Sequence, residues 1–435
     1  MTPAARVETA IDLLSQIAAA HRPAEQVVGE YLRARRFMGS KDRRAVADLV
    51  FSVLRAQARL CWWAGDVNAG ARARVLLALV LMQGYPPGRV AEFCDGGGYH
   101  PAPLEAHEEA MLAAAEGARL NDLRQSEAVR LEVPEWMLPH FERAFGADTA
   151  SELAALLEEA PLDLRVNPLM AEDRESVRAA LAEEGVQAEA TPYSPVGLRV
   201  SGRRAVTNTG PYRDGRIEVQ DEGSQLIALL TDARPGLAVC DFCAGAGGKT
   251  LALAGTMNDQ GRLVALDVEG ERLGRAGPRL SRAGARNVER RLLAAASDPW
   301  LTENAAAFDR VLVDAPCSGV GAWRRQPDSR WGTTENAVTL HQSRQAQILE
   351  QAARLVRPGG RLIYATCSLL PQENQEQVER FRASHPDFAP LPIEQVWRDT
   401  VGGSPVDSGP DLTLTPARHG TDGFYVAVLE RRGGS

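Results

Sequence analysis

Short apolar segments alternate with helical segments in the second half of the chain, and this alternation limits the fold more than any other feature. Four apolar runs end at polar or small residues and predict strands at residues 238–241, 262–267, 309–314 and 360–365. Helical patterns lie at residues 250–254, 269–283 and 341–356. Strands that alternate with helices predict a parallel, doubly wound α/β sheet, whose ligands bind beyond the carboxyl ends of the strands. We expect residues 423–430 to form a last strand, with residues 412–414 as its hairpin partner.

The sequence before residue 216 predicts two further parts. Residues 1–122 are rich in alanine and leucine, with apolar residues at helical spacing, and predict an all-helical domain. Residues 123–215 mix helical stretches with short strand-like runs and predict a small α+β module. Its expected helices are 149–159 and 172–184, and its expected strands are 162–168, 188–190 and 197–200. We therefore expect three domains, at residues 1–122, 123–215 and 216–435.

Composition excludes several classes of protein. With 435 residues, of which 44% are hydrophobic and 24% charged, the chain has enough apolar residues for a sizeable core. The longest uninterrupted apolar run, residues 75–82, is far shorter than the ~20 residues of a membrane helix. Asp12 and Ser15 interrupt the only apolar stretch near the N-terminus, which argues against a signal peptide. We expect a soluble cytoplasmic protein with no membrane partner. The sequence does not define an oligomeric state, and we favour a monomer.

The six cysteines are scattered and need no disulfides in a cytoplasmic chain. Cys240 and Cys243 form a CxxC pair, but no second pair of cysteines or histidines follows at the spacing of a zinc site. We therefore expect no metal ion.

The net charge of −8 argues weakly against a nucleic-acid partner, but the basic residues are clustered. All are arginines except Lys41 and Lys249. Three clusters stand out: Arg33, Arg35 and Arg36 with Lys41, Arg43 and Arg44; Arg203 and Arg204 with Arg213 and Arg216; and Arg324, Arg325 and Arg330. Attraction to phosphate is short-ranged at physiological salt, so an acidic protein can carry a local RNA-binding face. Each cluster alone is more often a solvated surface than a binding site.

A glycine-rich loop at residues 241–250 follows one predicted strand and opens a helix. Glycines let the backbone approach a ligand, and a helix N-terminus offers free N–H groups. A nucleotide-binding P-loop needs glycine where Cys243 stands, and a dinucleotide loop needs a third glycine that is missing here. An S-adenosylmethionine loop and a ligand-free tight turn both remain. On the first interpretation, Gly247→Arg should fill the space of the ligand.

Two acidic residues extend this pattern. Asp267 ends the next strand, 19 residues after Gly248, where a carboxylate can accept both ribose hydroxyls. It could equally cap the following helix. Asp298, before the strand at 309–314, is placed to bind an adenine amino group, although Asp298-Pro299 is also typical of a helix cap.

Two cysteines lie at the ligand-binding edge of the predicted sheet. Cys317 follows Asp314-Ala315-Pro316 at the end of one strand, and Cys367 follows Ala365-Thr366 at the end of another. Each alone would usually be a buried apolar residue. A thiolate can add to carbon 6 of cytosine, which makes carbon 5 nucleophilic, and an acid at ring nitrogen 3 stabilises the resulting enamine. Asp314, Cys317 and Cys367 supply these groups.

With these motifs the chain resembles the RsmB-like (Sun/Fmu) family of RNA cytosine-5 methyltransferases. The matching strings are residues 165–168, 219–225, 243–250, 314–321, 324–328, 365–368 with 371–374, and 421–425. The glycine loop departs from many relatives, because Ala246 stands where they have proline. More weakly, Lys41-Asp42-Arg43-Arg44 and residues 50–55 resemble the NusB-like helical domain of bacterial members.

The resemblance implies a Rossmann-like methyltransferase domain behind a small RNA-recognition-like module, with S-adenosylmethionine as cofactor and RNA, most of all ribosomal RNA, as partner. It implies Cys367 as nucleophile, Cys317 as the residue that assists product release, and Asp314 and Lys249 beside them. The expected cofactor-binding residues are Cys243, Ala244, Gly245, Ala246, Gly247, Gly248, Lys249, Asp267, Asp298 and Asp314. The target base is expected to be flipped out or single-stranded, and Trp323 and Trp331 are candidates to stack on bases or to lie in the core.

Three alternatives stay open. The substrate could be transfer RNA. The chain could be a DNA cytosine-5 methyltransferase, in which Cys317 would be the nucleophile. It could also be a non-catalytic RNA-binding assembly factor that keeps a relic of the cofactor pocket.

Overall fold

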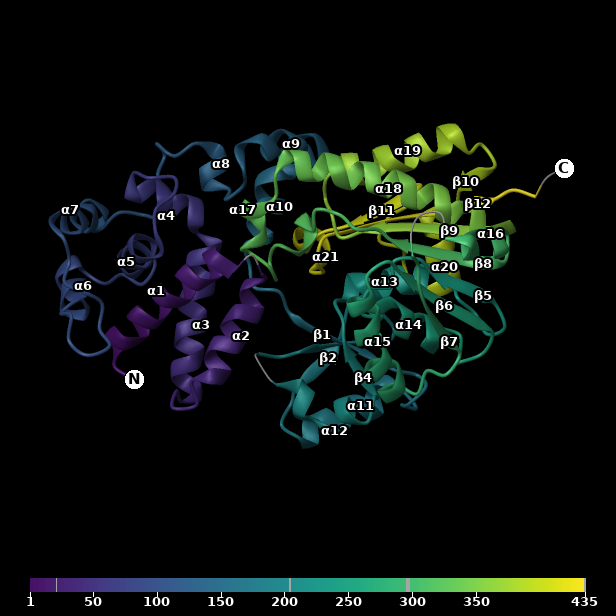
Figure 1. The fold of residues 1–435 in the computed structure, drawn as a ribbon, viewed down its shortest axis with the longest axis horizontal. Coiled ribbons are helices and arrows are strands. Elements are labelled where there is room, and N and C mark those ends of the chain that lie inside the picture. The colour runs from purple at the N-terminus through teal and green to yellow at the C-terminus, as the bar shows by residue number, and fades with distance from the viewer. Residues whose placement is uncertain (21, 203–204, 295–297, 434–435) are drawn as a thin grey trace. The chain divides into compact units, whose positions relative to one another are not determined.

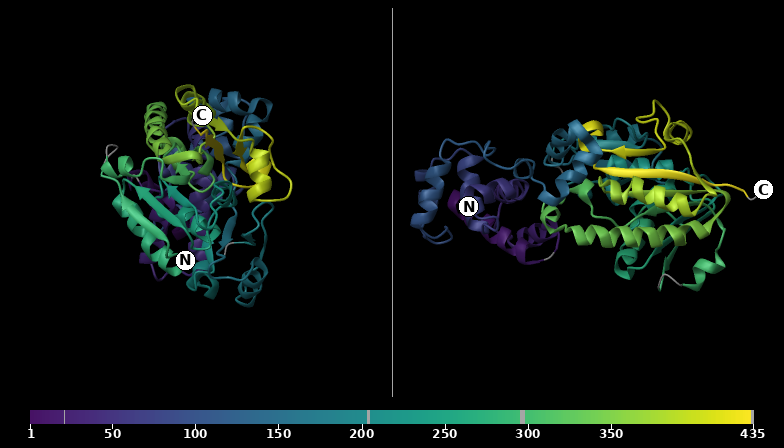
Figure 2. Two further views of the ribbon diagram at one scale, coloured as in Figure 1. Left: turned by 90° about the vertical axis from the view of Figure 1, so that its right-hand side faces the viewer. Right: turned by 90° about the horizontal axis from the view of Figure 1, so that it is seen from above.

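The computed structural model describes residues 1–20, 22–202, 205–294 and 298–433. It divides into two compact units, shown as ribbons in Figures 1 and 2. Unit 1 consists of Met1–Glu158 and Trp323–Thr334, and unit 2 of Glu159–Ala322 and Glu335–Ser435. The predicted domain boundaries at residues 122 and 215 stay a prediction.

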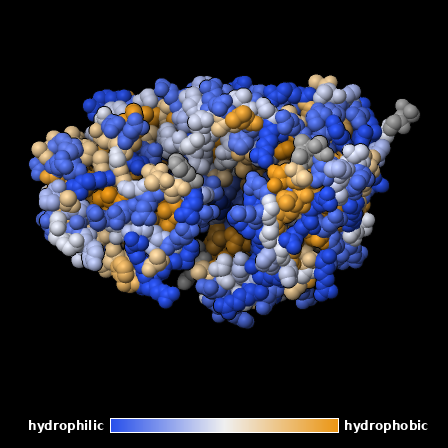
Figure 3. Space-filling model, in the orientation of Figure 1, coloured by the Kyte–Doolittle hydropathy of each residue, from blue (hydrophilic) through white to orange (hydrophobic). Residues whose placement is uncertain are grey.

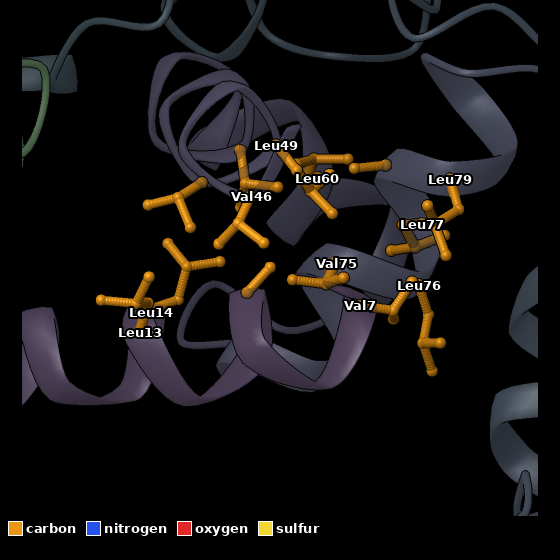
Figure 4. Packing of buried hydrophobic residues seen from close by; sticks show 14 of the residues in the cluster. Val7, Leu13, Leu14, Val46, Leu49, Leu60, Val75, Leu76, Leu77 and Leu79 are labelled. Carbon is orange, nitrogen blue, oxygen red and sulfur yellow. The ribbon is translucent and has the colours of Figure 1, made fainter. Parts of the chain in front are cut away.

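Unit 1 begins with an all-helical region, as predicted. Its helices are α1 (Pro3–Ala20), α2 (Ala24–Ala34), α3 (Ser40–Arg55), α4 (Gln57–Ala64), α5 (Ala71–Leu81), α6 (Pro87–Phe93) and α7 (Ala106–Ala115). Helix α5 is apolar on all sides from Val75 to Val80, and these residues are at most 7% exposed. A helix without a polar face belongs in a core. Figure 4 shows α5 side chains packed among those of α1, α3 and α4.

The rest of unit 1 contains α8 (Glu127–Arg130), α9 (Leu138–Phe145), α10 (Thr149–Ala155) and α17 (Ser329–Gly332). The segment Trp323–Thr334 belongs to this unit's core. Trp323 is fully buried, with its ring centroid 5.9 Å from that of Phe141. Arg330 is 2% exposed and donates to the carbonyl oxygens of Glu132 and Leu156. Trp323 is therefore a core residue, and Arg330 is no surface contact for phosphate.

A small antiparallel sheet opens unit 2. Its strand order is β2 (Ala188–Ala190), β3 (Gly197–Val200), β1 (Leu162–Val166) and β4 (Ile217–Val219). Helices α11 (Arg174–Glu183) and α12 (Gly210–Arg213) accompany it, and Val177 and Leu181 of α11 pack in its core. The α+β module is confirmed, with β4 as a strand that the sequence did not predict. Arg203 and Arg204 of the second basic cluster lie outside the described residues.

The large sheet of unit 2 is the predicted doubly wound sheet. Its order is β10 (Phe388–Pro390), β12 (Phe424–Arg431), β9 (Val356–Thr366), β8 (Phe308–Asp314), β5 (Ala238–Asp241), β6 (Arg262–Asp267) and β7 (Val288–Leu292). Neighbours from β9 to β7 run parallel, whereas β12 is antiparallel to β9 and β10. The predicted hairpin is confirmed, because β11 (Asp411–Leu414) pairs with β12.

Helices cover both faces of this sheet. Apolar side chains of α16 (Pro299–Glu303), α18 (Glu335–Leu355) and α19 (Gln375–Ser384) pack in one core layer. Those of α13 (Glu222–Leu230), α14 (Gly248–Thr256) and α20 (Ile393–Thr400) pack in another. Helix α15 (Gly270–Arg282) packs on α14, and the short α21 (Pro416–His419) precedes β12.

The strand order reverses between β5 and β8, because the chain leaves β5 toward β6 on one side and returns to β8 on the other. A crevice beyond the carboxyl ends of strands is expected at such a reversal. The face shown in Figure 3 is mainly hydrophilic, with hydrophobic residues in limited patches. Among the described residues, no helix combines the length and the apolar character needed to span a bilayer.

Candidate active site

A pocket of about 500 Å³ lies beyond the carboxyl ends of β5, β6, β8 and β9. Its wall contains five of the residues predicted from the sequence, Cys243, Asp267, Asp314, Cys317 and Cys367. Helix α18 adds a further wall through His341, Arg344 and Ile348. The volume is within the usual range for a small-molecule site.

The loop between β5 and α14 depends on glycine for two different reasons. Gly245 and Gly247 have φ values of 54° and 79°, which favour glycine. A Cβ atom at Gly247 would lie 2.8 Å from the Cβ atom of Ala276 in α15, whereas one at Gly248 would meet nothing within 4 Å. A side chain at Gly247 would therefore strike α15 rather than fill a ligand site. The expectation for Gly247→Arg was wrong in its reason, and Gly248 is the position that faces open space.

Asp267 holds this loop in place. Its Oδ2 accepts from the backbone N–H of Gly245 at 2.7 Å, and its Oδ1 accepts from that of Glu269 at 2.8 Å. The side chain is 93% buried yet lines the pocket, and a carboxylate can accept about four hydrogen bonds. Lone pairs therefore remain for ribose hydroxyls.

Asp298 caps a helix. Its carboxylate accepts from the backbone N–H groups of Trp300 and Ala294, both at 3.0 Å, and pairs with Arg291 at 3.3 Å. These backbone hydrogen bonds lower the pKa of Asp298. Asp298 is not among the described residues that line the pocket, so the structure does not bring it to the predicted adenine contact.

Lys249 and Asp314 form an ion pair, with Nζ 2.7 Å from Oδ2. Lys249 is 8% exposed, and its Nζ lies 5.6 Å from the centroid of the Phe424 ring. Burial alone would lower the pKa of the ammonium group. The Asp314 carboxylate outweighs burial through charge and hydrogen bonding, so the pKa of Lys249 is raised and the group stays charged.

Asp241, at the end of β5, is a fully buried residue beside the site to which the sequence assigned no role. Its Oδ2 accepts from the hydroxyl of Thr250 at 2.6 Å, and its Oδ1 is buried without a hydrogen-bond partner. Burial, aided by the charge of Asp314, raises the pKa of Asp241 to about 7. In the sequence, the only sign that Asp241 lies near the site was its position directly before the glycine loop.

The two cysteines of the sequence motifs meet. The Sγ atoms of Cys317 and Cys367 are 3.4 Å apart, and both thiols are free. The hydrogen bond to Cys367, followed by burial, raises the pKa of Cys317. Gly321 donates its backbone N–H to the carbonyl oxygen of Cys367 at 2.9 Å, which ties the two loops together.

Glu373 is a second residue whose contacts the sequence did not reveal. It lies in the 3-10 turn Pro371–Glu373 and is fully buried. Its carboxylate accepts from the hydroxyls of Ser318 and Ser368, each at 2.5 Å, and from the Ser318 backbone N–H at 2.9 Å. Gln345 adds a fourth donor at 3.1 Å. The residues that follow both cysteines are thus bound to one carboxylate. Only its place in the family-like string 371–374 hinted at this.

No group of three or more His, Cys, Asp or Glu side chains suited to a metal ion occurs within the part of the chain that the structure describes.

Of the glycine loop, only Phe242 and Cys243 are among the described residues that line this pocket, and the predicted residues from Ala244 to Lys249 are not. A doubly wound sheet with a glycine loop after β5 and paired cysteines in the pocket at its carboxyl edge is the architecture of a Rossmann-like methyltransferase. The family model for the 16S rRNA methyltransferase RsmB/F matches residues 228–430. The model for the ferredoxin-like domain of RsmF/B-like methyltransferases matches residues 133–207. This chain therefore belongs to the RsmB/F family of methyltransferases, and the similarities below agree.

A probable ribosomal RNA small subunit methyltransferase B of Synechocystis sp. is 35% identical over 303 residues, which cover 68% of this chain and 66% of that protein. The ribosomal RNA small subunit methyltransferase B of Pasteurella multocida is 34% identical over 324 residues, which cover 71% of this chain and 69% of that protein. The crystal structure of the protein PH0851 matches with a TM-score of 0.80 and 25% identity over 99% of both chains.

Proposed function

We propose that this methyltransferase acts on RNA and transfers a methyl group from S-adenosylmethionine to carbon 5 of a cytosine, through a covalent adduct at Cys367. The observation that carries the proposal is the pair of free thiols, 3.4 Å apart, on the wall of one pocket. A methyltransferase that acts on an already nucleophilic atom has no use for two adjacent thiols. Cytosine carbon 5 needs one thiol to activate the ring and a second group to restore it.

The residues present fit S-adenosylmethionine. The pocket has the volume of a cofactor site, and the loop from Cys243 to Lys249 begins helix α14 beside it. Asp267 lines the pocket and offers carboxylate lone pairs to a ribose. The cofactor supplies the methyl group when bound.

The protein's side chains account for the remaining chemistry. The Cys367 thiolate attacks cytosine carbon 6, and the electron pair of the ring double bond moves toward nitrogen 3. A proton held between Asp314 and that nitrogen stabilises the enamine, and Lys249 keeps Asp314 oriented. After carbon 5 gains its methyl group, a base removes the carbon 5 proton. The electrons of that bond re-form the double bond, and the carbon 6–sulfur bond breaks to return the thiolate. We assign assistance of this release to Cys317, and the 3.4 Å between its Sγ atom and that of Cys367 supports the assignment.

Small-subunit ribosomal RNA is the substrate we propose, because the relatives named above carry that substrate in their names. The small sheet of unit 2 supports it as an RNA-recognition module. It is joined to the cofactor loop through Arg279, which donates to the carbonyl oxygen of Ala246 at 2.7 Å and to Glu218 of β4 at 3.2 Å.

The test is methyl transfer from labelled S-adenosylmethionine to purified small-subunit ribosomal RNA, with bisulfite sequencing of the product. We expect one protected cytosine that is absent without the enzyme. Methylation of transfer RNA or of DNA instead would show that the proposed substrate is wrong and would identify the other nucleic acid as the substrate. No transfer to any of the three, from protein that binds the cofactor, would refute the proposal and favour an assembly factor.

A further inference from the structure

Two charged groups, Lys249 and Glu373, interact with the cysteine pair. Lys249 and Cys367 interact electrostatically, and the thiolate form of Cys367 favours the Lys249 ammonium. Glu373 contacts the two cysteine loops unequally: its carboxylate accepts two hydrogen bonds from Ser318, the residue after Cys317, and one from Ser368, the residue after Cys367. The unequal contacts of Glu373, together with the interaction of Lys249 with Cys367, make the two sulfur atoms inequivalent.

Glu373 is a buried carboxyl group whose hydrogen-bond partners are all neutral. It is fully buried, and its four donors are neutral groups: two serine hydroxyls, one backbone N–H and one glutamine amide. Among the described residues, no Lys, Arg or His nitrogen forms an ion pair with it. Donors of this kind hold a carboxylate in place without cancelling its field, so its charge acts on its neighbours in a medium of low dielectric constant.

We propose that Glu373 is a positioning residue of the cysteine pair, whose buried charge keeps the shared proton on Cys317 and leaves the thiolate on Cys367. The hydrogen bond between the sulfur atoms then runs from the Cys317 S–H to the Cys367 thiolate. The proposal deepens the proposed function, because it explains which cysteine attacks. It also gives a reason why one carboxylate accepts hydrogen bonds from both Ser318 and Ser368, the residues that follow the two cysteines.

The direction of the Cys317 pKa shift agrees with this assignment. The pKa of Cys317 is raised by its hydrogen bond to Cys367, then by burial, with the charge of Glu373 as a further contribution. The charged and titratable groups around the pair are Lys249 from α14, Asp314 from β8, Tyr364 from β9, Glu373, Cys243 from the glycine loop, and His341 and Arg344 from α18. Tyr364 donates to the carbonyl oxygen of Glu373 at 2.7 Å and so fixes the turn that carries the carboxylate.

The experiment measures the two thiols directly. The full-length protein, without RNA or cofactor, is alkylated with iodoacetamide at a series of pH values, and each cysteine is quantified by peptide mass spectrometry. Because the thiolate is the reactive form, the pH midpoint of each rate reports its protonation. We expect Cys367 to react at lower pH than Cys317. Glu373→Gln should reduce the separation between the midpoints by roughly one pH unit, mainly because Cys317 becomes easier to ionise.

Three variants distinguish charge from scaffolding. Glu373→Asp keeps the charge and should keep the separation. Ser368→Ala removes one hydroxyl donor but keeps the carboxylate, and it should also keep the separation. Glu379→Gln removes an exposed carboxylate from the neighbouring helix α19 and should change neither midpoint.

An unchanged separation in Glu373→Gln would overturn the proposal. So would an equal loss in Glu373→Gln and Glu373→Asp, since that would assign the effect to packing. Because neither RNA nor S-adenosylmethionine is present, these outcomes are independent of whether the proposed cytosine methylation is found.

Discussion

The Nζ atom of Lys249 lies 2.7 Å from Oδ2 of Asp314, which joins the start of helix α14 to the end of strand β8. Lys249 is nearly buried, whereas the Asp314 side chain is 33% exposed toward the pocket. The pair therefore connects the glycine loop to the cysteine loop. It leaves one carboxylate oxygen of Asp314 for another partner.

This ion pair should show energetic coupling. Lys249→Met leaves the carboxylate without its cation, and Asp314→Asn leaves a nearly buried ammonium without its anion. Each single variant should lower the thermal unfolding midpoint. The double variant removes both charges and should be more stable than the sum of the single effects predicts, by about 1–2 kcal/mol, between the values for surface and buried pairs. Strict additivity would show that the pair contributes no net interaction.

Substitution of Gly247 should destabilise the protein both through backbone strain and through a steric clash. A second glycine, Gly236, allows the two effects to be separated. Gly236 has a φ of 86°, close to the 79° of Gly247, but a Cβ atom there would meet nothing within 4 Å. Gly236→Ala should therefore cost only the strain of the left-handed backbone, about 1–2 kcal/mol. Gly247→Ala adds a clash with Ala276 and should cost a further ~1–3 kcal/mol. The measurement compares unfolding midpoints in urea, and equal shifts for the two variants would contradict the packing argument.

Asp241 should make the protein less stable as the pH rises. Its pKa is raised to about 7 in the folded protein, against an ordinary value of 3.8. Between these two values the folded state holds a proton that the unfolded state has released. The stabilising contribution is therefore complete below about pH 4 and is lost as the pH rises through about 7, at up to ~1.4 kcal/mol per pH unit.

The comparison that tests this is wild type against Asp241→Asn, which keeps an oxygen acceptor for the Thr250 hydroxyl. The stability of the variant relative to wild type should increase from pH 5 to pH 7 and then level off. A difference in melting temperature that does not change with pH would contradict the raised pKa.

Sequence patterns predicted the strands at the centre of the sheet best. The bounds of β5 and β6 coincide with the predicted runs, because buried parallel strands are continuous apolar segments. Strand β7 was missed because it has no such apolar run. Its sequence from Val288 to Leu292 contains one glutamate and two arginines, and four of its five residues are exposed at the edge of the sheet.

The residues of the candidate site also fall into a group that the sequence predicted and a group that it did not. Cys317, Cys367, Asp314 and Asp267 were predictable because parallel strands bring their carboxyl ends to one edge. The contacts of Glu373 depend on side chains from three separate segments, which no local pattern encodes. The burial of Arg330 was equally unpredictable, because it follows from the packing of Trp323–Thr334 within unit 1.

The turn between α2 and α3 should carry part of the RNA affinity. Arg36 in this turn is exposed, as are Lys41 and Arg44 near the start of α3, and Phe37 is 78% exposed beside Arg36. If all three cations contact phosphates, replacing them by alanine should make the slope of log affinity against log salt shallower by about 2 for a single-stranded RNA. A matched triple variant of the exposed Arg89, Arg119 and Arg124 should leave the slope unchanged. Equal slopes for wild type and both variants would exclude this turn from the RNA interface.

The two cysteines should behave alike in turnover and oppositely in covalent trapping. Cys367→Ala removes the sulfur that adds to carbon 6, so neither methylation nor an adduct should form. Cys317→Ala should still attack and methylate, but it should stall with RNA attached, because release of the carbon 5 proton and ejection of the Cys367 thiolate are impaired. The Sγ–Sγ distance of 3.4 Å places both sulfur atoms close enough to act on one ring.

A denaturing gel of reactions with labelled RNA and S-adenosylmethionine detects the covalent protein–RNA adduct of each variant. A slow-migrating protein–RNA band is expected for Cys317→Ala and none for Cys367→Ala. Cys94→Ala, a buried cysteine of unit 1, serves as the control and should turn over like wild type. The opposite pattern of bands would make Cys317 the nucleophile, as in the DNA-type arrangement. Bands in neither variant, with an RNA that the wild-type protein methylates, would refute a mechanism in which one cysteine attacks and the other releases the product.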